Sequence, residues 1–135
     1  MVSTNSIDTN IVVRCLTDDD FHQRKLVHDL LSTPNAVFCL EDVALSEVVY
    51  VLSGVYQKSR SEIINLLNFF LARYSSSIKY NRALTAAVFP FYLEHPKLSF
   101  NDCCLAYYAE ANHAEPLFTF DRKLAKQHSS AKLLA

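Results

Sequence analysis

The chain has 135 residues, of which half are hydrophobic, about a fifth are charged and only one, Gly54, is a glycine. A dinucleotide-binding turn or a nucleotide phosphate loop needs several glycines where the backbone approaches phosphate, so both kinds of site are excluded. The formal net charge of −1 gives no overall attraction to nucleic acid or to an anionic membrane. Any contact with phosphate must therefore be local.

Length and segment boundaries predict a single domain over residues 1–135. A chain of this length buries roughly two-thirds of its unfolded surface, which is enough for a core without disulfides or a structural metal. The four cysteines lack a CxxC spacing and lie in apolar stretches, as is typical of a reducing compartment. Neither a signal-peptide pattern nor a membrane-spanning apolar run occurs, so we expect a cytoplasmic protein without a membrane partner.

The predicted elements alternate along the chain. Short apolar runs bounded by polar residues predict strands at residues 5–8, 36–40, 77–80, 116–120 and 131–134. The stretches between them have helical spacing. Ser59 and Glu62 form a capping-box pattern at the start of one helix, and Pro90 is expected to kink or end another. This alternation predicts an α/β fold with a mainly parallel central sheet of four to five short strands flanked by helices.

Two aspartates follow the carboxyl ends of predicted strands, which is where parallel α/β sheets usually bind ligands. Asp8 ends the first predicted strand, and Asp121 follows the strand predicted at residues 116–120. If both strands are central and parallel, the two carboxylates emerge at one edge of the sheet. Taken alone, each aspartate is better explained as the N-cap of the following helix.

Glu47 and Asp102 are acids within otherwise apolar helical patterns. Glu47 is in line with Val43 and Val51, so it is either buried with a compensating partner or exposed by a rotation of the helix. Asp102 stands at a helix start, where capping is the alternative explanation. Four clustered carboxylates need a hard divalent cation, Mg²⁺ or Mn²⁺, and such a site suits phosphoryl chemistry.

Four segments resemble the PIN-domain nucleases, and within them the VapC-type toxins of bacterial toxin–antitoxin pairs: IDTNIVVRCL, ALSEVVYVL, LSFNDCCLAYYAE and LFTFDRKLAK. They occur in the family's order and approximate spacing, so the resemblance spans essentially the whole chain. It implies a PIN-like three-layer fold and a metal-dependent endoribonuclease with Mg²⁺ or Mn²⁺ as cofactor. The implied catalytic and metal-binding acids are Asp8, Glu47, Asp102 and Asp121. The implied partners are an RNA substrate, a second copy of the chain in a homodimer, and a cognate antitoxin that blocks the metal site.

Further polar residues lie close to these motifs. Asn10 and Thr119 are interpreted as supporting residues that orient ligands or water, with turn chemistry and strand propensity as the alternatives. Candidate RNA phosphate contacts lie within about a helical turn of Asp8 or Asp121. They are Arg14, Arg122, Lys123 and Lys126. A solvated helix face is the simpler explanation of each cation on its own.

Two helical stretches, residues 47–56 and 63–74, carry more apolar bulk than one helix face buries. Most of this bulk is expected in the core. The surplus is expected to form a dimer interface or to receive a partner helix. The residues concerned are Tyr50, Tyr56, Phe69, Phe70 and Tyr74.

Other functions were weighed against the nuclease. A receiver domain needs a phosphoacceptor aspartate near mid-chain, and no aspartate occurs between Asp42 and Asp102. A catalytically inactive PIN module that acts by protein binding is disfavoured by the retention of all four acids. A housekeeping RNA-processing nuclease and a DNA-directed nuclease stay open, because no residue separates them from a toxin.

Overall fold

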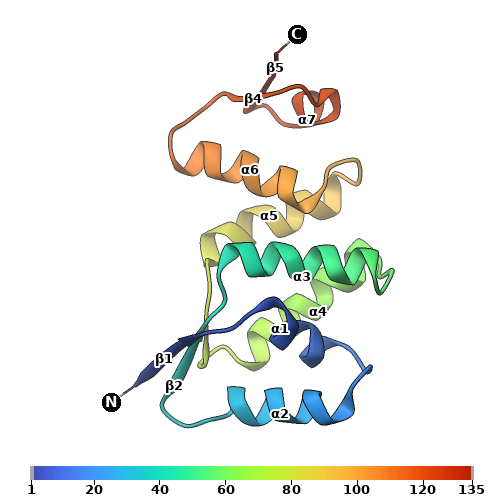
Figure 1. The fold of residues 1–135 in the computed structure, drawn as a ribbon. Helices are drawn as coiled ribbons and strands as arrows, with labels where there is room; N and C mark the ends of the chain where they lie inside the picture. The colour runs from blue at the N-terminus through green and yellow to red at the C-terminus, as the bar shows by residue number, and fades with distance from the viewer. Residues whose placement is uncertain (1, 135) are drawn as a thin grey trace. The chain divides into compact units, whose positions relative to one another are not determined.

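A computed structural model describes residues 2–134 of the chain. The described chain divides into two compact units, the first ending at Asn81 and the second beginning at Arg82. Each unit contains helices and its own parallel sheet (Figure 1). The α/β class and the parallel pairing are therefore confirmed, and the five strands of the described residues form one sheet of three and one of two.

The sheet of the first unit has the strand order β1-β2-β3, with β1 at one edge. Its strands are β1 (Ser3–Ser6), β2 (Ala36–Cys39) and β3 (Ile78–Lys79). The prediction of a strand over residues 5–8 was displaced by two residues, because no apolar run builds β1. All four of its residues are exposed. Backbone hydrogen bonds to the neighbouring segment hold it, at 3.0 Å from the Ser3 N–H to the Asn35 carbonyl.

Four helices complete the first unit: α1 (Thr9–Leu16), α2 (Phe21–Leu31), α3 (Asp42–Gly54) and α4 (Arg60–Arg73). α1 packs against α2 and α3, and α3 packs against α4. The capping box of Ser59 and Glu62 at the start of α4 is confirmed. Gly54 is the last residue of α3, and apart from its chain neighbours and the backbone of its own helix, no atom lies within 4 Å of the place where a Cβ would stand. The core is formed by fully buried side chains, among them Val12, Leu31, Leu45, Leu52, Leu67 and Phe70.

The second unit consists of α5 (Arg82–Glu94), α6 (Phe100–Ala111), β4 (Leu117–Thr119), α7 (Arg122–Gln127) and β5 (Ala131–Leu133). α5 packs against α6, and β4 pairs with β5. The prediction was that Pro90 kinks or ends this helix, and an end is excluded because α5 continues to Glu94. Proline removes one backbone donor, but the buried side chains of Phe89 and Tyr92 hold the helix on either side of it.

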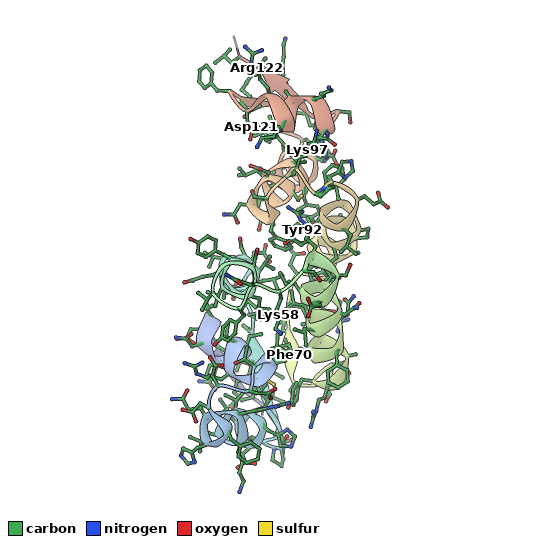
Figure 2. All side chains as sticks on the ribbon, turned by 90° about the vertical axis from the view of Figure 1, so that its right-hand side faces the viewer. Lys58, Phe70, Tyr92, Lys97, Asp121 and Arg122 are labelled. Atoms are coloured by element: carbon green, nitrogen blue, oxygen red, sulfur yellow. The ribbon has the colours of Figure 1, made fainter. Side chains whose placement is uncertain are left out.

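The aromatic surplus of the first unit divides between core and surface. Phe70 and Tyr74 are buried, and Figure 2 shows Phe70 directed into the unit. Tyr50 and Phe69 are exposed. Among the described residues, no helix has the length and apolar character needed to cross a bilayer.

Candidate metal centre

The first unit places two of the predicted acids next to a single buried hydroxyl group. Asp8 lies two residues beyond the end of β1, and its Oδ1 accepts a hydrogen bond from the Ile11 N–H at 3.3 Å, so it caps α1. The next residue, Thr9, is buried. Its Oγ1 donates a hydrogen bond to Oε2 of Glu47, in the middle of α3, at 3.0 Å. The packing of α1 against α3 therefore brings the residue that follows Asp8 into contact with Glu47.

Glu47 is exposed, so the hypothesis of a buried carboxylate with a compensating partner was wrong. The core face of α3 is formed by other residues, including Leu45, Val48 and Leu52. Val43, which made Glu47 look like part of an apolar stripe, is itself 76% exposed. The helix is rotated as the alternative explanation required, and solvent can reach the Glu47 carboxylate.

The second unit places the other two acids at the starts of helices. Asp102 and Ser99 form a capping box, in which Oδ2 of Asp102 accepts from the Ser99 N–H at 3.2 Å. Asp121 caps α7, and its Oδ1 accepts from two backbone N–H groups at 2.8 and 3.3 Å. The Asp121 N–H donates to Oγ1 of Thr119 at 2.9 Å. Thr119 therefore holds the backbone of Asp121.

All four acids share one arrangement of their carboxylate oxygens. One oxygen is held by a hydrogen bond, and the other has no protein partner among the described residues. The unpartnered oxygens are Oδ2 of Asp8, Oε1 of Glu47, Oδ1 of Asp102 and Oδ2 of Asp121. A carboxylate that is held at one oxygen keeps the other available to a hard cation, although any helix-capping aspartate, such as Asp20, has the same arrangement.

The donor set fits Mg²⁺ or Mn²⁺ in its chemistry. Mg²⁺ is typically bound through one or two carboxylates, with water and substrate phosphate completing the shell. Within residues 2–134, no three acidic, histidine or cysteine side chains form a complete metal cluster. Thr9 follows Asp8 in the chain and donates a hydrogen bond to Glu47.

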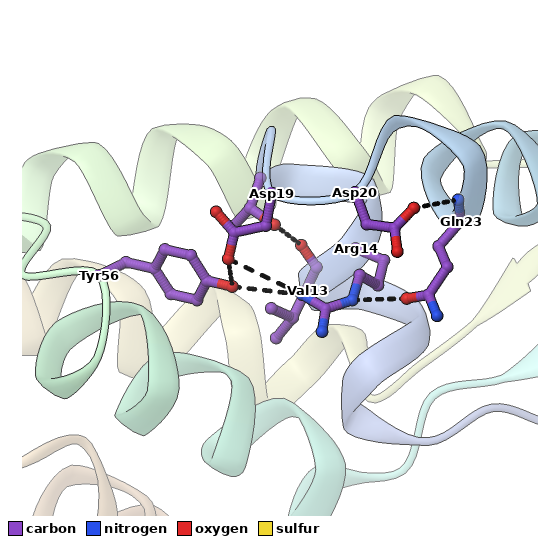
Figure 3. A network of polar contacts seen from close by, with 7 residues as sticks. Val13, Arg14, Asp19, Asp20, Gln23 and Tyr56 are labelled. Carbon is purple, nitrogen blue, oxygen red and sulfur yellow. Dashed lines mark hydrogen bonds and ion pairs between the residues drawn. The ribbon is translucent and has the colours of Figure 1, made fainter.

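Arg14 takes part in a network away from the acids, in the last turn of α1 (Figure 3). Its Nε donates to Oε1 of Gln23 at 2.7 Å, and its Nη1 donates to the Tyr56 hydroxyl at 3.3 Å. The same Nη1 lies 3.9 Å from Oδ2 of Asp19. These contacts join α1 to α2 and to the segment after α3, so the geometry gives no support to a phosphate contact by Arg14.

The other predicted cations lie on α7, beside Asp121. Arg122 and Lys123 are in its first turn and Lys126 is in its last turn, and all three are exposed. Figure 2 shows Arg122 next to Asp121. None of the three has an acidic partner among the described residues, so each is available to a phosphate group. Asn10 is exposed in the first turn of α1, not in a turn that precedes the helix.

The segments that contain these acids match a known family over most of the chain. The PIN domain family matches residues 6–128, a range that includes all four acids. The chain belongs to the PIN-domain family. PIN domains are generally metal-dependent nuclease modules that use divalent metal ions. No curated protein matches this chain.

Thr9 is the residue of this PIN domain that sequence reasoning missed. It lies between Asp8 and Asn10, for both of which the sequence predicts a role. A threonine hydroxyl is common at the start of a helix and so does not by itself indicate a functional residue. Its contact with Glu47 spans 38 positions in the sequence. Only the packing of α1 against α3 reveals it.

Proposed function

We propose that this PIN domain is an endoribonuclease that depends on Mg²⁺ or Mn²⁺ and hydrolyses RNA phosphodiester bonds. The residues that would hold the cation are Asp8, Glu47, Asp102 and Asp121. The observation that carries the proposal is that each of these carboxylates is fixed at one oxygen and free at the other. When bound, a divalent cation activates water and stabilises the charge that develops on the phosphate.

The chain's own residues have distinct parts in this proposal. Helix caps fix the direction of Asp8 and Asp121, and the Thr9 hydroxyl fixes that of Glu47. Thr119 supports Asp121 from the preceding strand. The exposed cations of α7 neutralise backbone phosphates and orient the RNA, as Arg and Lys do in most nucleic-acid complexes.

The proposal requires the acids of the two units to act on one cation, so we propose that residues 1–135 work as a single domain.

The test compares purified wild-type protein with the Asp8→Asn variant on RNA in Mg²⁺, with the RNA ends mapped by sequencing. Asparagine is as good an N-cap as aspartate, so the fold is expected to survive. Asp29→Asn, an exposed aspartate of α2, is the matched control. We expect the wild type and the control to make the same discrete cuts, and Asp8→Asn to make none. Cleavage by Asp8→Asn at the wild-type rate, or cleavage in EDTA, would exclude the proposed site.

We further propose that the nuclease is the cytoplasmic toxin of a toxin–antitoxin pair. Val43 and Tyr50 are exposed on α3 and give an apolar surface for a second copy or for an antitoxin. Expression of the wild type alone is expected to arrest growth, whereas expression of Asp8→Asn is not. Light scattering is expected to give twice the 15.3 kDa mass of one chain. Active wild-type enzyme without growth arrest would favour the housekeeping nuclease, and absence of cleavage would favour the inactive module.

A further inference from the structure

A groove between α2 and α4 in the first unit consists of two adjoining cavities of about 400 and 560 Å³. The cavities share three lining residues, His28, Arg73 and Tyr74. The first cavity is bounded by the end of α1 and by α2 and α4. The second continues past the starts of β1 and β2 to the residues before β3. We call the two together the α2–α4 groove.

The lining of the α2–α4 groove carries positive charge and contains no acidic residue. Its cations are Arg24, Lys25 and Arg73. Arg24 forms an ion pair with Asp18, which lies outside the lining. Lys25 and Arg73 are exposed and have no acidic partner within residues 2–134. Uncompensated cations along a groove attract an anionic chain and make its binding depend on salt.

Exposed phenylalanine rings stand on two sides of the first cavity. Phe21 of α2 is 80% exposed and Phe69 of α4 is 62% exposed. Both rings line the same cavity as the cations Arg24, Lys25 and Arg73. Flat exposed rings beside cations are the means by which proteins hold single-stranded nucleic acid, because every base has a face that stacks.

The Cys15 thiol and the Tyr74 hydroxyl are uncharged groups in the lining of the first cavity. The Tyr74 hydroxyl lies 2.8 Å from Nδ1 of His28 and is also hydrogen-bonded to the Cys15 thiol. Burial raises the pKa of the Cys15 thiol and of the Tyr74 hydroxyl above their ordinary values. Both groups therefore stay protonated at neutral pH, and neither offsets the charge of Lys25 and Arg73.

The second cavity is rich in hydrogen-bonding side chains. Six of its lining residues carry a hydroxyl or an amide: Ser32, Thr33, Asn35, Tyr74, Ser76 and Ser77. Such groups suit phosphate oxygens and ribose 2′-hydroxyls. Apolar residues also line this cavity, so the choice of RNA over a partner helix rests on the uncompensated cations of the groove. The sequence of ring, cation and hydroxyl along the groove favours a single strand of RNA.

We propose that the α2–α4 groove is an exosite for single-stranded RNA, an inference that rests on the proposed ribonuclease function. The groove passes the start of β1, whereas Asp8 follows its end. The extended segment from Val2 to Asp8 spans about 20 Å at about 3.3 Å per residue. Nucleotides in the groove are therefore distinct from those at the acids. The groove holds the RNA and takes no part in cleavage.

The experiment measures binding in EDTA, where no metal-dependent cleavage can occur. Fluorescein-labelled U12 and dT12 are titrated with protein, and anisotropy is followed at several salt concentrations. The charge variant is Lys25→Gln/Arg73→Gln, and its matched control, Lys97→Gln/Lys132→Gln, removes two exposed lysines of the second unit. Phe69→Ser removes the ring, and Phe69→Leu keeps apolar bulk without a flat ring. All changed side chains are exposed, and circular dichroism checks that each variant is folded.

We expect the charge variant to bind U12 at least tenfold more weakly than the wild type and the control. The slope of log binding constant against log salt concentration is expected to become shallower by about 1.4, because each of the two lost phosphate contacts contributes about 0.7 on a single strand. Both Phe69 variants are expected to lose about fivefold or more, because stacking needs the ring. Weaker binding of dT12 is expected, because the 2′-hydroxyl is absent.

Unchanged U12 binding by the charge variant, or no RNA binding by the wild type, would overturn the exosite. The same holds if Phe69→Leu binds U12 as the wild type does, because base stacking on this ring would then not hold the strand. The proposed nuclease is tested independently by Asp8→Asn in Mg²⁺, so either proposal can fail alone. With cleavage established, the charge variant is expected to raise KM and to leave kcat unchanged.

Discussion

Oγ1 of Thr9 donates a hydrogen bond to Oε2 of Glu47 at 3.0 Å and ties the first turn of α1 to the middle of α3. The acceptor Glu47, and Asp8, the residue before the donor Thr9, are two of the four acids that we propose as metal ligands. Glu47 is exposed and would otherwise be free to change rotamer. The position of the Glu47 carboxylate therefore depends on a hydroxyl group that does not itself touch the metal in our proposal.

Replacement Thr9→Val removes this hydroxyl and keeps the side-chain shape. We expect the affinity for Mg²⁺, measured by calorimetry, to fall about ten- to a hundredfold, as is typical when a group that orients a metal ligand is lost. Thr4→Val, at an exposed position of β1, is the matched control. A wild-type Mg²⁺ affinity in folded Thr9→Val would show that Glu47 needs no such support.

Replacement Asp121→Asn separates the capping role of Asp121 from its proposed metal role. Asparagine can accept the same backbone hydrogen bonds, so the free energy of unfolding is expected to change by less than about 0.5 kcal/mol. Mg²⁺-dependent cleavage is expected to fall more than about a hundredfold. Asp121→Ala loses the cap as well and is expected to cost about 1 kcal/mol in addition. If Asp121→Asn cleaves normally, Asp121 is a cap and nothing more.

The capping box of α4 predicts a dependence of stability on pH. The Ser59 N–H donates to Glu62 and holds the pKa of that carboxyl below its ordinary value of 4.5. A lowered pKa in the folded state contributes stability above pH 4.5, and the contribution is lost as the pH falls through the folded value. We therefore expect wild type to be more stable than Glu62→Gln at pH 7, by urea denaturation, and the difference to shrink below pH 4.5. A difference that is constant from pH 7 to pH 3 would contradict this explanation.

Pro90 lies inside α5 and is exposed, so its replacement tests what holds that helix together. Pro90→Ala restores a backbone donor and removes the ring that crowds the preceding turn, while giving the unfolded chain more freedom. We expect a net gain of about 1–2 kcal/mol in the free energy of unfolding, measured by thermal and urea denaturation. A loss of stability would mean that packing around Pro90 depends on a distorted helix.

Features encoded by neighbouring residues could be predicted from the sequence. The capping box of Ser59 and Glu62 needs only two side chains three positions apart, and it is confirmed. The positions of Asp8 and Asp121 shortly after strands follow from local composition, although each strand ends two residues earlier than the acid. Local hydrogen bonding decides these features, so long-range packing changes little.

Features decided by packing could not be predicted. Val43 and Glu47 share one face of α3. The orientation of this helix depends on the face that packs against α1 and α4, and the residues buried there include Leu45 and Val48 instead. The passage of α5 through Pro90 depends on buried neighbours such as Phe89. The polar segment of β1 gives no apolar alternation to read, since backbone pairing with β2 builds the strand.

The exposure of all four residues of β1 has a consequence for local opening of the fold. Between that strand and Asp8 a single residue, Ile7, is buried. Segments with few buried apolar contacts open at low free energy, so the amide protons of β1 are expected to exchange with deuterium faster than those of α3. Asp8 therefore lies between a strand that opens at low free energy and the packed first turn of α1. We expect cation binding at Asp8 to slow the amide hydrogen exchange of β1.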